Sequence, residues 1–391
     1  MNHFNGFAIS SQGFNHIKAG NKPCQDASGF VSDKDMSVIV VADGHGSDNY
    51  PRTDLGAKFA VDAAIHSIRE YVQILNEKQI PFDVNDNEDA QLLEISKNIL
   101  NHWHSNVDED VKNNPFTETE LEKVSEKYKI KYRSGEAELV AKAYGTTLIA
   151  VCITSTYWFG IHIGDGKCIA FDENINCLEP IPWDDNCQAN ITTSLCDSNA
   201  IDEFRFFKSN ELPLSVFIGC DGIDDSYTND KELQNLYRTI LMIFAEYGCD
   251  KGIAEVESFL PSLSKKGSGD DVSIAGLVTS TITKEAIDLL KAQIEYENAS
   301  SNLEKLSKEC AIAREKVEYI ESALRKMRDS LADNEEKLKN AEAECDRIAK
   351  ELTVARKRCE EADLALNVAR DGLMKEATDA VLDQKVEPIE E

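Results

Sequence analysis

The chain has 391 residues, which is enough for one large domain with an appendage or for two ordinary domains. Its formal net charge is −29, from 71 acidic against 42 basic side chains, so phosphate backbones and anionic lipid would repel it. Composition therefore argues against nucleic acid and membrane surfaces as partners, while the many carboxylates suit divalent cations.

The N-terminal residues lack the basic and apolar regions of a secretory signal, and no apolar run approaches the length of a membrane span. The eleven cysteines are scattered and contain no CxxC pair, which argues against a zinc motif and a disulfide framework. We therefore expect reduced thiols and a cytoplasmic location.

Apolar, β-branched runs recur through the first part of the chain and predict strands at 37–42, 147–153, 157–163, 214–220 and 272–278. A short polar turn joins the second and third runs, which predicts a hairpin. Helical spacing of apolar residues predicts helices at 55–75 and 90–107, and the charged stretch 108–138 is expected to be a surface insertion with little packing content. Several strands with few helices between them indicate an α+β fold, with helices on the outer faces of largely antiparallel sheets.

The character of the sequence changes after about Thr283, where proline and glycine disappear until Gly372. A heptad repeat with a at Leu303 and d at Leu306 continues for about ten heptads with Asn334 as its only polar member, which predicts a coiled coil. We therefore expect a globular domain at 1–281, a coiled-coil helical region at 282–376 and a flexible acidic tail at 377–391.

The apolar seam of this coiled coil needs a partner helix. The partner is either a second copy of the chain or the same chain folded back near Asp333–Asn334. The unbroken heptad phase through that point favours a continuous helix, and hence a homodimer that is parallel or antiparallel, over the hairpin.

Carboxylates accompany the predicted strands in a repeated pattern. Asp-Gly pairs follow three strands, an Asp-Asp pair precedes the last strand, and one more aspartate lies near the N-terminus: Asp43-Gly44, Asp165-Gly166, Asp221-Gly222, Asp270-Asp271 and Asp26. Each alone is compatible with a solvated turn. Carboxylates gathered at one edge of a core repel one another unless cations lie between them, and oxygen ligands suit Mg²⁺ or Mn²⁺. The pattern thus predicts a two-metal site, with solvated turns as the alternative.

Other reactive residue types near these elements have ordinary structural explanations. His102 and His104, in the segment NHWH, are expected on the surface of the second helix, because no carboxylate-rich stretch is spaced with them as a zinc site. Cys220, directly before Asp221, is expected to be a buried thiol and not a nucleophile, because no His/Asn partner is spaced for it.

Six segments resemble, in the same order, motifs of the metal-dependent protein phosphatases of type 2C: CQDA (24–27), VADGHGS (41–47), YGTTLIA (144–150), HIGDGK (162–167), GCDGIDD (219–225) and GDDVSIAGL (269–277). The resemblance covers most of residues 5–280 and none of the helical tail. The opening SQGFNHIKAGNKPCQD and the serine of DGHGS are similar to the bacterial branch of that family. The resemblance implies a sandwich of two antiparallel β-sheets flanked by helices, with two Mn²⁺ or Mg²⁺ ions, and a third weaker position, at one end.

The resemblance also implies roles for individual residues. The implied metal-binding set is Asp26, Asp43, Gly44, Asp165, Asp221, Asp225 and Asp270. Asp43 would bridge both metals, and a water activated by the metals would attack the phosphorus of a phosphoserine or phosphothreonine in a protein substrate. His45 would protonate the departing oxygen as a general acid.

The chain departs from the family pattern at the position of the phosphate-binding arginine. Asn21 stands there, and Lys18 and Lys22 are the nearby candidates to bind the substrate phosphate. Gln25 replaces the usual glutamate, and Asp224 stands where many relatives carry tryptophan. The alternative to a serine/threonine phosphatase is a catalytically weak adaptor with the phosphatase fold, which recruits partners through its coiled coil.

Overall fold

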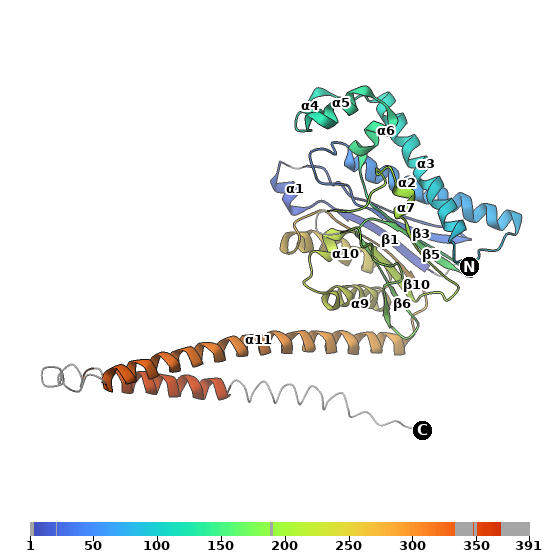
Figure 1. The fold of residues 1–391 in the computed structure, drawn as a ribbon. Coiled ribbons are helices and arrows are strands. Elements are labelled where there is room, and N and C mark those ends of the chain that lie inside the picture. Colours follow the sequence, from blue (N-terminus) through green and yellow to red (C-terminus); the bar gives the residue numbers. More distant parts are fainter. Residues whose placement is uncertain (1–3, 21, 188–190, 333–346, 348–349, 369–391) are drawn as a thin grey trace, which may run out of the picture. The chain divides into compact units, whose positions relative to one another are not determined.

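The computed structural model describes residues 4–20, 22–187, 191–332, 347 and 350–368 (Figure 1). The chain divides into two compact units, Met1–Glu295 and Tyr296–Glu391. The boundary falls within helix α11 (Lys284–Ala332), beyond residue 281, where the sequence predicts the end of the globular domain. The predicted tail at 377–391 lies outside the described residues.

The described part of the first unit forms two antiparallel five-stranded sheets. One sheet has the strand order β1 (Phe4–Ser11), β10 (Val272–Thr279), β9 (Ser215–Gly219), β6 (Lys167–Phe171), β7 (Cys177–Leu178). The other has the order β2 (Ala27–Ser32), β3 (Met36–Ala42), β4 (Leu148–Thr154), β5 (Trp158–Ile163), β8 (Arg205–Ser209). The predicted α+β class and the sandwich of two antiparallel sheets are confirmed, and β4 and β5 form the predicted hairpin.

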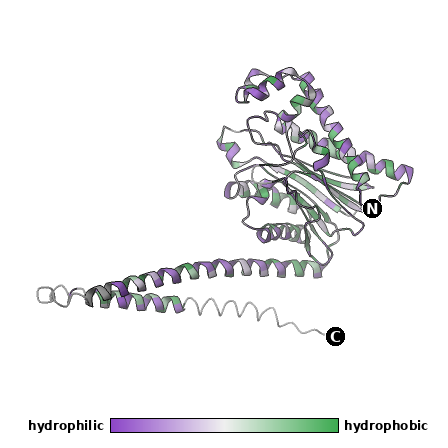
Figure 2. Ribbon diagram, in the orientation of Figure 1, coloured by the Kyte–Doolittle hydropathy of each residue, from purple (hydrophilic) through white to green (hydrophobic). Residues whose placement is uncertain are grey.

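Strand β3 illustrates why these sequences form a layered core. Every residue of β3 is buried, and alternate residues pack into two different hydrophobic clusters, with Val38 and Val40 in one and Ile39 and Val41 in the other. Since successive strand side chains point to opposite faces, a strand that is buried at every position requires cover on both sides. Burial of each such side chain stabilises the fold by roughly 1.5–3 kcal/mol. The sheets are accordingly coloured mainly as hydrophobic in Figure 2.

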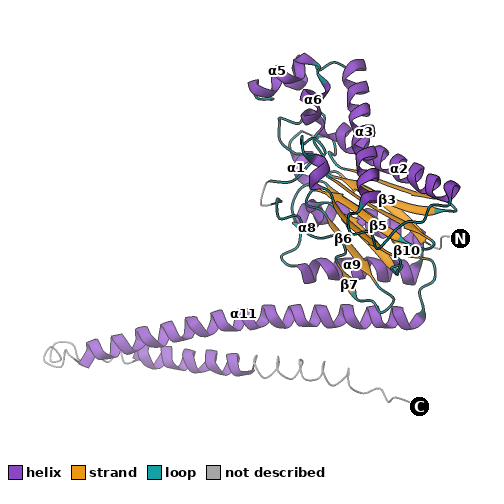
Figure 3. Cartoon of the chain, turned by 45° about the vertical axis from the view of Figure 1, so that its right-hand side comes forward, coloured by secondary structure: helices purple, strands orange, loops and turns teal. Residues whose placement is uncertain are grey.

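Helices cover the outer faces of the sandwich (Figures 1 and 3). Helices α2 (Thr53–Lys78) and α3 (Ala90–Asn113) confirm the two predicted helices and pack with the sheet that contains β3. Helices α9 (Asp230–Tyr247) and α10 (Cys249–Lys266) pack with the other sheet. The shorter helices are α1 (Phe14–Lys18), α4 (Glu118–Leu121), α5 (Glu126–Ser134), α6 (Ala137–Val140), η1 (Ala141–Tyr144), α7 (Ala200–Glu203) and α8 (Asp221–Asp224). None of the helices in the described ranges has the length and apolar content needed to cross a membrane.

The insertion at 108–138 is better packed than its charged sequence suggests. Leu121 and Tyr132 are buried in the core cluster that includes α2 and α3. The guanidinium of Arg52, whose side chain is only 6% exposed, donates to Glu120 at 2.8 Å and to Asp110 at 3.0 Å. The expectation of little packing content is therefore wrong. Charged residues that bond one buried arginine cannot be distinguished in a sequence from charged residues that face water.

The second unit contains a helical hairpin. Within this unit α11 lies beside a helix at 350–368 (Figures 1 and 3), and Val317 and Leu324 line one cavity together with Leu352 and Cys359. All four are a positions of the predicted heptad, and each is half-buried. The chain therefore reverses direction between the two helices, and the continuous helix favoured by the heptad phase is wrong. An unbroken phase does not exclude a hairpin, because each arm carries its own apolar stripe whatever joins them.

Candidate metal centre

Strand ends and strand starts bring aspartates to one edge of the sandwich. Strands β3 and β5 run into loops that contain Asp43 and Asp165, and Asp221 follows β9 as the first residue of helix α8. Asp26 directly precedes β2, and Asp270 lies two residues before β10. Helices α1 and α8 lie at this end of the strands (Figure 3).

The register of the strands explains why these residues meet. The first residue of β2 pairs with the last residue of β3, and the last residue of β9 pairs near the start of β10. Ligand-type atoms of Asp26, Asp43 and Cys220 consequently lie within 4.8 Å of one another. Asp26 is buried, and its Oδ2 atom has no hydrogen-bond partner among the described residues.

The carboxylates of this edge repel one another, which makes the charged form of each less stable. Burial, followed by the charge of Asp271, raises the pKa of Asp26 to about 8. Burial and then the charges of Asp26 and Asp221 raise the pKa of Asp43 well above its usual value. Burial and then Asp221 raise the pKa of Asp165 to about 6.

The same effect reaches two further predicted ligands. Burial first, and the charge of Asp221 among the further causes, raise the pKa values of Asp225 and Asp270. Neighbouring carboxylates that repel one another, one of them buried with an unpaired oxygen, are the donor set that a hard divalent cation requires. The described residues therefore fit the implied Mn²⁺ or Mg²⁺.

The Asp-Gly turn after β3 has no room for a larger residue. A Cβ atom at Gly44 would lie 2.4 Å from the carbonyl oxygen of Gln25 and 2.5 Å from Oγ1 of Thr53. The backbone of the turn thus packs directly against the strand start that carries Asp26 and against the start of α2. Glycine is required here by close approach and not by backbone conformation.

His45 lies beside the aspartates in a polar contact that the sequence did not reveal. Its Nε2 atom is 2.8 Å from Oγ of Ser194, which in turn donates to the carbonyl of Thr146 at 3.0 Å. Burial, and then the positive charge of Lys142, lower the pKa of His45 to about 4, while Asp221 acts in the opposite direction.

The structure separates the roles of the two adjacent aspartates before β10. Asp271 is buried and accepts hydrogen bonds from the backbone N–H groups of Gly13 and Gln25, and it lies 3.0 Å from Nδ1 of His16. Asp271 therefore holds the N-terminal segment against β10, while Asp270 is the more exposed of the two. The sequence showed an Asp-Asp pair but could not assign this positioning role, which depends on a contact between distant segments.

The lysines proposed for the substrate phosphate lie at the end of α1 and shortly after it. Lys18 is exposed, with its ammonium 4.4 Å from the centre of the Phe14 ring. Lys22 is half-buried, and its carbonyl accepts from Gln12. Asn21 lies outside the described residues. We find a different cation close to His45, namely Lys142 of the short helix η1, which the sequence did not single out because no motif marks it.

Lys142 is placed by aromatic contacts. Its ammonium lies 4.9 Å from the centre of the Tyr50 ring, and the Tyr50 ring is 4.8 Å from the imidazole of His45. The positive charge of Lys142 is one of the causes of the low pKa of His45. Lys142 thus supplies positive charge next to the aspartate edge.

A groove of about 390 Å³ extends from the aspartate edge. It is lined by Asp165, Asp221 and Asp225 and by the half-exposed ring of Trp183. Asp224 also lines the groove, and neither of its carboxylate oxygens has a hydrogen-bond partner among the described residues. The groove offers a substrate both negative charge, which cations would offset, and an aromatic surface.

Comparisons with known proteins found one matching family model and several similar solved structures. A family model described as protein phosphatase 2C matches residues 12–257. Among solved structures, the chain is similar to a bacterial serine phosphatase, with 13% identity over 72% of this chain and 100% of that chain and a TM-score of 0.44. No protein in a search of curated proteins matches.

Two further solved structures are similar at comparable levels. PppA, a regulatory component of the T6SS in Pseudomonas aeruginosa, is 15% identical, with 71% of this chain and 97% of that chain covered and a TM-score of 0.44. The catalytic domain of the serine threonine protein phosphatase PstP, in complex with two manganese ions, is 14% identical, with 70% and 98% covered and a TM-score of 0.41.

The family model spans more than half of the chain and contains most of the aspartates of the candidate metal centre. The six ordered motifs, the two antiparallel sheets and the match to the family model point to the same assignment. The chain belongs to the protein phosphatase 2C family.

Proposed function

We propose that this member of the protein phosphatase 2C family hydrolyses phosphoserine and phosphothreonine in proteins with the help of Mn²⁺ or Mg²⁺. The observation that carries the proposal is the set of mutually repelling aspartates at one edge of the sandwich, of which Asp26 is buried and Asp43 and Asp165 are half-buried. Such a set costs stability unless cations offset its charge. A fold alone would not require it.

The proposed ligands are those that the sequence predicts: Asp26, Asp43, Gly44, Asp165, Asp221, Asp225 and Asp270. Two cations, when bound, would lower the pKa of water and so supply the nucleophile, and a third would occupy a weaker position. Within this set, Asp43 holds the central place, because the charges of Asp26, Asp221 and Asp165 all act on its carboxyl group.

We assign proton delivery to His45. Burial keeps its imidazole mainly neutral at neutral pH, so the general-acid role needs a source of negative charge that favours the imidazolium. A bound phosphate dianion is such a source, since an opposite charge nearby raises the pKa of a histidine. The contact with Ser194 holds the ring in place.

The leaving group tests this role. His45→Ala should lower kcat strongly for phosphoserine peptides, whose departing alkoxide needs a proton, and much less for an aryl phosphate. Ser194→Ala should have the same selectivity to a smaller degree, because it removes only the contact that orients the ring. Equal losses on both substrate types would refute the assignment of His45.

We propose Lys142 as an additional cation for the substrate phosphate beside Lys18 and Lys22. A lysine would act as a point charge, without the two-pronged geometry of arginine. Single alanine variants of the three lysines distinguish them: the residue that binds phosphate should raise KM for a phosphopeptide more than the other two. If none of the three raises KM, the phosphate is held by other groups.

The catalytic proposal is tested by paired aspartate variants. Asp221→Asn should reduce turnover by orders of magnitude, and a chelator should abolish the activity of the unmodified protein. Asp230→Asn is the matched control, because Asp230 lines the same groove but is 68% exposed and pairs with Lys167 at 2.7 Å. If the unmodified chain binds Mn²⁺ but does not hydrolyse any phosphopeptide, the adaptor alternative replaces the enzyme.

We also propose that two copies associate through the helical unit. The hairpin leaves Leu303 and Ile320, predicted a and d positions, about half exposed at 51% and 50%, and a second hairpin would bury them. Sedimentation of the full chain and of a chain that ends at Glu295 tests this: the full chain should sediment as a dimer and the shortened chain as a monomer. A full chain that sediments as a monomer removes the homodimer.

A further inference from the structure

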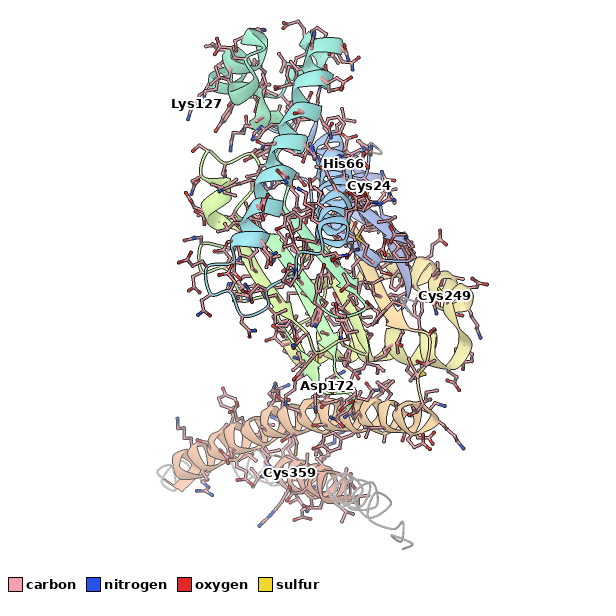
Figure 4. The ribbon with its side chains drawn as sticks, turned by 90° about the vertical axis from the view of Figure 1, so that its right-hand side faces the viewer. Cys24, His66, Lys127, Asp172, Cys249 and Cys359 are labelled. Carbon is pink, nitrogen blue, oxygen red and sulfur yellow. The ribbon has the colours of Figure 1, made fainter. Side chains whose placement is uncertain are left out.

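A cluster of metal-binding side chains lies on the two helices that cover one sheet, apart from the aspartate edge. His66 and Glu70 of α2 and His102 of α3 each offer a ligand atom, and these atoms lie within 4.8 Å of one another. The rings of His66 and His102 are 4.6 Å apart between their centres. His66 is labelled on α2 in Figure 4. We propose that these three residues bind one Zn²⁺ ion or a similar transition metal.

The spacing along α2 suits two ligands on one face. Residues four apart on a helix are neighbours, and Nε2 of His66 is 3.9 Å from Oε2 of Glu70. The third ligand comes from α3, which packs beside α2 in the same core cluster. A metal held by both helices would therefore link two elements that are separated in the sequence by the loop at 79–89.

His102 is already oriented by a neighbouring side chain. Its Nδ1 atom is 3.0 Å from Oγ of Ser67, and Ser67 is buried. When the Nδ1–H donates to this hydroxyl, Nε2 carries the lone pair that a metal needs. Histidine ligands in metal sites commonly have such a partner on the second nitrogen, which fixes the ring and the tautomer.

The donor set selects the class of metal. Two imidazoles and one carboxylate, with water as a fourth ligand, match the open tetrahedral sites that bind Zn²⁺. Imidazole nitrogen also distinguishes this site from the all-oxygen aspartate edge, which suits Mg²⁺ or Mn²⁺. Zn²⁺ ligands in such a tetrahedron lie about 3.3 Å apart, so the exposed side chains of His66 and Glu70 need only small rotations to close on the ion.

The position along α2 separates the two sites. Thr53, at the start of α2, touches the Gly44 turn of the aspartate edge, and His66 lies roughly 20 Å further along the helix at 1.5 Å per residue. Zn²⁺ at the helices therefore does not share ligands with the aspartate edge. Its expected effect is to hold α2 and α3 together.

Equilibrium dialysis of the full chain against Zn²⁺, with excess Mg²⁺ to occupy the oxygen sites, tests the proposal. The unmodified protein should retain one Zn²⁺ more than His66→Ala and His102→Ala, and each variant should bind at this site more than a hundredfold more weakly. His104→Ala is the matched control on α3 and should behave as the unmodified protein. Ser67→Ala should weaken binding about 10–100-fold, as expected for the partner of a ligand.

The spectrum of the bound metal gives a second readout. X-ray absorption of the retained Zn²⁺ should show scattering from two imidazoles, and this contribution should fall in His102→Ala. If His66→Ala and His102→Ala retain the same Zn²⁺ with unchanged affinity, or if His104→Ala loses as much as they do, the site does not exist. All three histidine variants alter residues on the outer helices, and circular dichroism establishes that each is folded.

Discussion

Replacement of Arg52 by methionine should destabilise the globular unit severely. The guanidinium is almost fully buried and donates to Glu120 (2.8 Å), Asp110 (3.0 Å), the carbonyl of Asn114 (2.7 Å) and the hydroxyl of Tyr144 (2.8 Å). Methionine retains much of the apolar packing of the side chain but leaves the carboxylates of Asp110 and Glu120, which are 14% and 31% exposed, without their cation. Loss of one partner from a buried ion pair costs about 3–5 kcal/mol.

That free energy corresponds to a large thermal shift. A loss of 1 kcal/mol lowers the midpoint of a domain of this size by about 2–4 °C, so we expect Arg52→Met to unfold roughly 6–20 °C lower. Arg133→Met is the control, because Arg133 pairs with Glu118 in the same insertion with both side chains about half exposed or more. An exposed pair contributes little, so the control should unfold near the unmodified protein. Differential scanning calorimetry at neutral pH measures both variants.

Acid should reduce the difference between Arg52→Met and the unmodified protein. Burial alone would raise the pKa of Glu120, but hydrogen bonds from Arg52 and then Thr117 lower it to about 2. A carboxyl group with a depressed folded-state pKa contributes stability that is present above its ordinary pKa, 4.5, and is lost as the pH falls through about 2.

If Arg52→Met unfolds within about 2 °C of Arg133→Met at neutral pH, the buried network does not hold the insertion.

Three further predictions concern the borders of the metal centre and of the globular unit. Gly44→Ala should abolish phosphatase activity, because its Cβ would overlap the carbonyl of Gln25 at 2.4 Å; unchanged kcat would show that the turn can shift freely. Asp271→Ala should speed the hydrogen exchange of the backbone amide of Gln25, because the Asp271 carboxylate accepts a hydrogen bond from that amide. Unchanged protection of the amide would contradict this. Leu290 is fully buried in the core cluster of the sheet with β10, so Leu290→Ala should cost about 2–5 kcal/mol in chemical denaturation. A loss below about 1 kcal/mol would mean that the start of α11 is not part of that core.

The sequence predicted the parts of this protein that depend on local pattern. Alternation and continuous apolar runs predicted β3, β4, β5, β9 and β10, and helical spacing predicted α2 and α3. The ordered motifs around Asp43 and Asp221 predicted the family that the match to residues 12–257 confirms. These features can be predicted because they depend only on residues close together in the sequence. Strand and helix periodicity is such a feature, and so is the residue that follows a strand.

Tertiary structure decided the contacts between segments that are distant in the chain. Arg52 bonds Glu120, Asp271 accepts from Gln25, and His66 lies beside His102. The two residues of each pair are at least 36 positions apart in the sequence. Tertiary structure also decided that the helical unit is a hairpin. The sequence could not show this, because an apolar heptad stripe has the same phase in a continuous helix and in a hairpin. Local patterns specify which face of an element is apolar, but the partner that covers that face depends on how the whole chain packs, because burial is non-directional and any complementary surface can satisfy it.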